Sequence, residues 1–351
     1  MASRIHTSAA ITFGTLIGLS GGAMADHHTM SVETQALKQW HNAILSGYTS
    51  LADKSEALAQ AAAGFCAQPD PDDRAVAEQA WLEGFLAWQK VRFVDFGPVE
   101  SSNLAWQFQF WPDPKNLVGS KARFLLNSDD PITAEQIDQS GVAVQGFPMA
   151  EYLLFDTQFN NTPGALANGK GCDLLVAVTN RIQVNSKMLA QDWATFRTHY
   201  VTTPQYKDTT VRAGMAGLEI LEERRLAQPM GIRGSGKRSV YAADAWRSGS
   251  SLMAAEASVS GLNNYFMPGF VTLLEASDEP ELARRITDQF NETLGNFPAL
   301  REPMATLVET DDAFARLQSF YVDVSQLANL VNSQAAVTLG VARGFNSSDG
   351  D

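Results

Sequence analysis

The sequence predicts an all-α protein made of two antiparallel helical bundles, for which an internal duplication is one explanation. Apolar side chains recur three and four residues apart, as at Leu37, His41, Ile44 and Tyr48, which is the spacing of one face of an amphipathic helix. Long alanine-rich runs are separated by short segments rich in proline and glycine. We find no series of alternating strands, so helical bundles are the architecture that the pattern favours.

The helical pattern runs along most of the chain. The expected helices cover residues 31–64, 72–96, 165–200, 207–227, 242–266, 280–295 and 311–343. We place the bundles at residues 26–202 and 203–351. The segment GFPMAE, which ends at Glu151, shares its spacing with GMAGLE, which ends at Glu219, and such an echo arises from duplication or from chance.

The first 25 residues have the features of a secretory signal. A cationic start at Arg4 is followed by an apolar run and by the small-x-small sequence Ala23-Met24-Ala25. We therefore expect cleavage after Ala25 and a periplasmic protein. No later segment has the roughly 18 uninterrupted apolar residues of a membrane span, so membrane insertion is not expected. The net charge of −13 argues against nucleic acid as a partner.

Cys66 and Cys172 are the two cysteines of the chain. In an oxidising compartment a disulfide between them is the expected state, and two unpaired buried thiols are the alternative. The bond would join the end of the first helix to the start of the helix after the GFPMAE segment.

Glu151 raises the main chemical question of the sequence. It lies in QGFPMAEYLLF, among apolar and small residues, and we expect it to be largely buried and ionised. A buried carboxyl group must be paired, protonated or metal-bound. Arg92 ends an aromatic helical stripe, and we expect it to be the first-choice partner of Glu151 because a guanidinium pairs with a carboxylate through two hydrogen bonds.

A polar pocket around Glu151 is one interpretation of the surrounding sequence. Glu100, Trp111 and Asp113 follow Arg92 in a stretch that contains Pro-Asp-Pro, which cannot be the interior of a helix. The alternative, which the residues alone favour slightly, is an ion-pair cluster that fixes this loop without a ligand. His41, on the apolar face of the first helix, is more often a hydrogen-bonded core residue than a ligand.

The mature N-terminus offers a separate metal site. Cleavage after Ala25 would expose Asp26-His27-His28, in which the amine, two amides and the imidazole of the third residue can surround Cu(II) or Ni(II) in a square plane. A histidine pair without a role is the competing interpretation. Elsewhere we find neither an HExxH nor a GxSxG motif, so nucleophilic or zinc-protease catalysis has little support.

The chain resembles the imelysin-like family of exported bacterial proteins. The resemblance rests on GFPMAEYLLF, FQFWPDPKN, GKRSVYAADAWRSG and the tail LGVARGFNSSDGD, together with the signal peptide and the helical layout. It implies a two-bundle all-α fold, a classification with metallopeptidases, a link to iron uptake and a site at a GxHxxE motif. Here Gly146 and Glu151 match that motif, but Pro148 stands where the histidine would be, which breaks the implied metal pair.

Three functions follow, in order of preference. The first is a non-catalytic periplasmic binding or accessory protein in iron or other metal acquisition, whose ligand is a metal ion or small solute. An iron-uptake component of the outer or inner membrane would be its partner. The second is a metal-dependent peptidase that uses ligands outside the motif. The third is a structural or protein-interaction module. The candidate binding residues are Glu151, Arg92, Glu100, Trp111, Asp113, Gly146, Pro148, His41 and Glu219.

Overall fold

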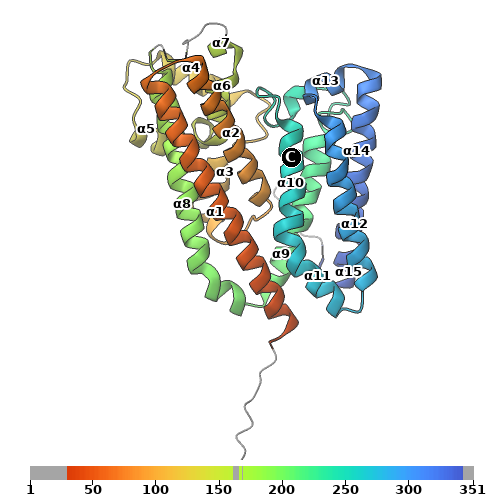
Figure 1. Cartoon of the computed structure of the whole chain (residues 1–351). Helices are drawn as coiled ribbons and strands as arrows, with labels where there is room; N and C mark the ends of the chain where they lie inside the picture. Colours follow the sequence, from red (N-terminus) through yellow and green to blue (C-terminus); the bar gives the residue numbers. More distant parts are fainter. Residues whose placement is uncertain (1–29, 161–165, 168, 343–351) are drawn as a thin grey trace, which may run out of the picture. The chain divides into compact units, whose positions relative to one another are not determined.

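The fold is all-α, as the sequence predicts. Figure 1 shows the computed structural model of the chain, in which residues 30–160, 166–167 and 169–342 are described. Within these ranges the regular structure is helical and no strand occurs. Contacts divide the chain between Met30 and Ser31, and the description below concerns the compact unit that begins at Ser31. No helix of the described part has the length and apolar character needed to cross a membrane.

Residues before position 203 form two long helices, a group of short ones and a third long helix. The helices are α1 (Val32–Ala67), α2 (Pro71–Val91), η1 (Gly97–Asn103), α3 (Leu104–Phe108), α4 (Leu117–Asn127), α5 (Ala134–Gln139), η2 (Val142–Val144), α6 (Gly146–Phe155), α7 (Thr157–Asn160) and α8 (Gly171–Thr202).

Later residues continue the helical pattern with π-helical segments within it. The helices are α9 (Gln205–Glu219), η3 (Ile220–Ala227), η4 (Val240–Ala242), α10 (Ser251–Gly261), η5 (Leu262–Phe266), α11 (Met267–Ala276), α12 (Pro280–Asn296), η6 (Phe297–Leu300), α13 (Met304–Glu309), α14 (Asp311–Asn329), η7 (Leu330–Ala335) and α15 (Ala336–Thr338). The segments η3, η5 and η7 are π-helical.

Helix α1 is at the centre of the packing. It lies against α2, α8 and α11, and α2 in turn contacts α10, while α12 and α14 pack on each other (Figure 1). The face of α1 that the sequence pattern predicts is buried, including Leu37, Ile44 and Tyr48. Local signals set where the long helices begin: the side chains of Ser31 and Asp70 accept backbone N–H groups at the starts of α1 and α2.

A disulfide joins Cys66 to Cys172, which confirms the expected pairing. Cys66 lies in the last turn of α1 and Cys172 in the first turn of α8, so the bond connects the two helix ends that the sequence indicated. The alternative of two free thiols is thereby excluded within the described chain.

One expected helix begins later than predicted. The helix placed at 242–266 starts as α10 at Ser251, and residues 243–250 form turns instead. Two residues in this stretch have a positive φ, Ala245 at 49° and Gly249 at 70°, a conformation that cannot continue a right-handed helix. This turn segment, rather than a helix, supplies one wall of the site described below.

The division near residue 202 and the duplication stay predictions. Glu151 and Glu219 end the two similar segments, but the segments lie at different places in their helices. GFPMAE begins α6, whereas GMAGLE forms the end of α9.

Candidate functional site

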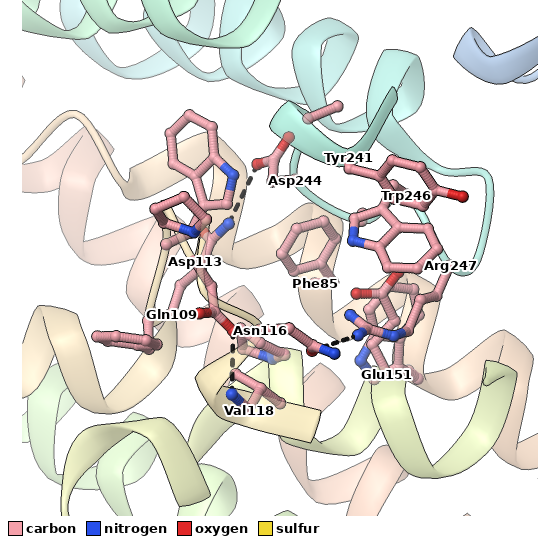
Figure 2. A pocket seen from close by; sticks show the side chains of 17 residues that line it. Phe85, Gln109, Asp113, Asn116, Val118, Glu151, Tyr241, Asp244, Trp246 and Arg247 are labelled. Carbon is pink, nitrogen blue, oxygen red and sulfur yellow. Dashed lines mark hydrogen bonds between the residues drawn. The ribbon is translucent and has the colours of Figure 1, made fainter. Parts of the chain in front are cut away.

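Three of the sequence segments noted above meet around one cavity of about 310 Å³. They are the loop around Trp111 before α4, the first turns of α6, and the turn segment before α10 (Figure 2). The lining residues are Trp81, Phe85, Gln109, Phe110, Trp111, Asp113, Pro114, Asn116, Val118, Pro148, Glu151, Tyr241, Ala243, Asp244, Ala245, Trp246 and Arg247.

Gly146 fixes the position of α6 beside the loop. Its φ is +73°, and a Cβ atom there would lie 2.3 Å from the carbonyl oxygen of Phe108 and 2.4 Å from that of Gln107. Only glycine tolerates both the conformation and this approach of two backbones. Gly146 is therefore a structural requirement of the site: it allows α6 to begin where Pro148 and Glu151 reach the cavity.

Glu151 is buried, as the sequence predicts, with 4% of its surface exposed. Its Oε1 accepts hydrogen bonds from the backbone N–H of Ser248 at 2.9 Å and from the Ser248 hydroxyl at 3.0 Å. Burial raises the pKa of the Glu151 carboxyl to about 7; the Ser248 hydrogen bonds and the charge of Arg247 act against this, and the charge of Asp244 adds to it.

The expected pairing of Glu151 with Arg92 is wrong. The ion pair that Arg92 makes in the described part of the chain is with Asp244, at 3.9 Å. Glu151 lies instead beside Ser248 and Arg247, both from the turn segment before α10. The sequence argument chose Arg92 because it is the only cation on the aromatic stripe of its helix. It could not see that a segment almost a hundred residues later folds over α6.

Asp244 is the centre of a buried polar network. Its Oδ2 lies 3.1 Å from Arg225 Nη2 and accepts a hydrogen bond of 3.1 Å from the side-chain amide of Gln109 (Figure 2). Gln109 in turn accepts hydrogen bonds from Trp88 and Gln89. This network ties the turn segment to α2, to the loop and to η3.

Arg92 and Arg225 both lie next to Trp111. Their guanidinium carbons are 5.3 and 5.9 Å from the centre of the Trp111 ring. Burial lowers the pKa of Arg92, as does the neighbouring charge of Arg225, whereas Asp244 raises it. The two arginines thus neutralise Asp244 from outside the cavity, since neither is among the residues that line it.

Asp113 lines the cavity and also fixes the loop. Its two carboxylate oxygens accept the backbone N–H groups of Leu117 at 2.7 Å and of Val118 at 3.0 Å, at the start of α4 (Figure 2). A carboxylate at the amino end of a helix is stabilised by these donors and by the helix dipole. The loop-fixing role that the sequence favoured is therefore present, although its partner is backbone rather than a cation.

Arg247 closes the site between α4 and the end of α6. It donates to Asp156 at 3.1 Å and to the side chain of Asn116 at 2.8 Å. Its guanidinium carbon lies 4.3 Å from the Trp246 ring centre and 5.0 Å from that of Tyr152. Sequence reasoning did not select Arg247, Ser248 or Asp244. The signal was the segment GKRSVYAADAWRSG, used only as a mark of resemblance.

The other candidates lie away from the cavity lining. Buried His41 makes a hydrogen bond of 2.9 Å between Nε2 and the Trp193 carbonyl, and burial lowers its pKa, as expected of a core histidine. Glu100 is exposed and accepts the Gly97 N–H. Glu219 ends α9. Asp26, His27 and His28 lie outside the described residues.

The imelysin family model, which bears the name of the M75 peptidases, matches residues 44–331, most of the chain. The chain belongs to the imelysin family. An imelysin-like protein from Psychrobacter arcticum 273-4 has a similar structure, with a TM-score of 0.76 and 21% identity, over 90% of this chain and 98% of that one. A "putative iron-regulated protein A precursor" from Parabacteroides distasonis ATCC 8503 also has a similar structure. Its TM-score is 0.64 and its identity 15%, over 87% of this chain and 96% of that one. No curated protein matched.

At these identities the two structures show that this chain shares their fold.

The residues present do not fit a resident metal ion at Glu151. Within the described ranges there is no group of three or more histidine, cysteine, aspartate or glutamate side chains that could hold one. Position 148 is proline, which has no ligand atom, and the Arg247 cation acts on the Glu151 carboxyl. The residues around Glu151 thus form a polar, aromatic cavity.

Proposed function

We propose that this imelysin is an exported, non-catalytic accessory protein in iron or other metal acquisition, and that it binds a small solute in the cavity around Glu151. Export to the periplasm rests on the signal sequence of residues 1–25. The link to iron rests on the family and on the name of the Parabacteroides neighbour.

The convergence of three segments on one cavity carries the binding proposal. Side chains from α6, from the loop before α4 and from the turn segment before α10 enclose about 310 Å³, a size suited to a small organic molecule. The cavity combines aromatic walls with a few polar groups held in place by other residues. A pocket of this composition is what small-molecule binding requires.

A metal-dependent peptidase remains the competing function, and one observation favours it. The Glu151 carboxyl has a pKa raised to about 7, which suits a general base at neutral pH. Against it stand the proline at position 148 and the lack of a metal-ligand group among the described side chains.

The deciding experiment is native mass spectrometry and elemental analysis of the protein purified from the periplasm of its own host. We expect a small solute, alone or with a metal, to co-purify with the wild type and to be lost from Glu151→Gln. A variant of an exposed carboxylate, Glu309→Gln, should retain it. Chelator-sensitive proteolysis that disappears in Glu151→Gln would establish the peptidase instead. If neither solute binding nor proteolysis is detected, a purely structural role is the function that is left.

A further inference from the structure

The carboxylate groups that line the cavity differ in how many of their oxygen atoms already have partners in the protein. Both hydrogen bonds that Glu151 accepts from described residues end on Oε1, so its second oxygen is left for a ligand. Asp113 uses both oxygens on the start of α4. Asp244 accepts from Gln109 through Oδ2, and the same oxygen is paired with the guanidinium groups of Arg225 and Arg92. Glu151 is therefore the carboxylate of the cavity that has an oxygen to offer and makes no ion pair with a described cation, whereas the charge of Asp244 is already neutralised by two arginines.

The charge of the lining favours a cation over an anion. Its charged side chains are three carboxylates, at positions 113, 151 and 244, and one guanidinium, Arg247. That guanidinium is already held by Asp156 and Asn116. An anionic ligand would meet three carboxylates and a single guanidinium that already has an anionic partner, whereas a cation would meet the acceptor of Glu151.

Aromatic side chains form most of the remaining wall. They are Trp81, Phe85, Phe110, Trp111, Tyr241 and Trp246. Trp111 and Trp246 already lie beside arginine guanidinium groups, at 5.3 Å from Arg92 and 4.3 Å from Arg247, which shows that ring faces in and around this cavity attract cations. Ring faces are most effective for weakly hydrated organic cations.

We propose that the cavity binds an organic cation, an alkylammonium group or a quaternary ammonium group, with Glu151 as its counter-ion and the aromatic wall around its alkyl part. This inference rests on the proposed function, since it names the ligand class of the same cavity. A bare metal ion fits less well, because the described lining provides no group of three or more ligating side chains and the cavity is far larger than an ion.

The test is a titration of the whole mature protein at pH 8, followed through the indole N–H signals of tryptophan in NMR spectra. The probes are n-butylammonium, butyltrimethylammonium, n-butanol and n-butyrate, which have similar alkyl parts and differ in charge. We expect both cations to bind with a Kd in roughly the millimolar range, as fragments of this size do. The alcohol and the carboxylate should bind at least about tenfold more weakly, since they lack the charge that Glu151 recognises.

Two variants assign the binding to the named groups. Glu151→Gln keeps an oxygen for Ser248 and so should fold, as circular dichroism checks, but it should weaken the cations at least about tenfold. Tyr241→Ala removes an exposed ring of the wall and should weaken butyltrimethylammonium more than n-butylammonium. Glu100→Gln, whose carboxylate is exposed and outside the lining, should bind like the wild type.

Equal binding of the alcohol, tighter binding of the carboxylate, or unchanged binding in Glu151→Gln would each overturn the organic-cation proposal. If the cations fail while a solute still co-purifies from the periplasm and depends on Glu151, the proposed function stands and only the ligand class is wrong. Failure of both measurements removes the binding function itself.

Discussion

Glu151 is a buried carboxyl group whose native pKa of about 7 lies above its ordinary value of 4.5. Below pH 4.5 the group is protonated in both folded and unfolded chains. Between pH 4.5 and 7 the native state keeps the proton that the unfolded state releases, so the free energy of unfolding falls as pH rises. Above pH 7 the penalty is complete, on the order of 3 kcal/mol at about 1.4 kcal/mol per pKa unit.

Glu151→Gln should therefore remove a pH-dependent penalty rather than break an ion pair. The amide is neutral at every pH and can still accept from Ser248. We expect the variant to be within about 1 kcal/mol of the wild type at pH 5 and about 1–3 kcal/mol more stable at pH 8. Urea denaturation at both pH values measures this. A stability difference that stays constant between them would contradict the raised pKa.

Removing the charge of Asp244 should strongly lower the free energy of unfolding. Its pair with Arg225 joins Nη2 and Oδ2 at 3.1 Å, and both side chains are only 3% exposed. Asp244→Asn should destabilise by about 3–5 kcal/mol because it leaves Arg225 charged and unpaired in the interior. A matched control is Asp311→Asn, whose pair with Arg238 has a similar length of 3.0 Å but whose carboxylate side chain is 94% exposed. It should change unfolding midpoints little, and equal effects of the two variants would refute the argument.

The start of α6 depends on Gly146 for two separable reasons. Gly146→Ala would place a methyl group against two backbone oxygens and would also force a left-handed conformation on alanine. Gly234 has the same φ of +73°, but a Cβ atom added there would meet no other atom within 4 Å, so Gly234→Ala isolates the conformational cost of about 1–2 kcal/mol. We expect Gly146→Ala to lose at least twice as much in thermal or urea unfolding, and similar losses would mean that the backbone approach is relaxed.

The long helices could be predicted because their signals are local. The apolar spacing of α1 and the proline starts of α2 and α12 give these helices within a few residues. The prediction of a helix over residues 242–250 was wrong because the alanines of this stretch suit a helix. Its turns are held by local hydrogen bonds to the carbonyls of Asp244 and Ala245, and by tertiary contacts of Asp244 with Gln109 and of Ser248 with Glu151. The short helix α4 was not predicted, because the apolar spacing of the sequence gives no helical signal there.

The site was predictable only in its individual residues. A glutamate among apolar residues is expected to be buried and to need a partner, and Glu151 is buried and accepts two hydrogen bonds from Ser248. Its partner was not predictable, because Ser248 lies 97 residues further along the chain and joins α6 only in the fold. In the same way, Arg92 was selected as the partner of Glu151. It pairs instead with Asp244, which comes from a segment whose conformation was misjudged.

The disulfide constrains the whole molecule through the loop it closes. Cys66 and Cys172 are 106 residues apart, and this loop carries every cavity residue from Trp81 to Glu151, while Tyr241 to Arg247 come from outside it. Without the bond, the unfolded segment that carries most of the cavity residues is no longer closed into a loop and gains conformational freedom. Under the chain-entropy model, Cys66→Ser with Cys172→Ser should lose roughly 4–5 kcal/mol, an upper figure.

Urea denaturation of the double serine variant tests this, because an unfolded chain without the cross-link exposes more surface and the slope of the transition should rise as its midpoint falls. The matched control also joins α1 to α8, but without a covalent bond: the hydroxyl groups of Ser55 and Ser186 are hydrogen-bonded at 2.9 Å in the interior. Ser55→Ala with Ser186→Ala should cost only about 1 kcal/mol and leave the slope unchanged. If both double variants shift the midpoint equally with equal slopes, the disulfide acts as a local contact and not through the unfolded state.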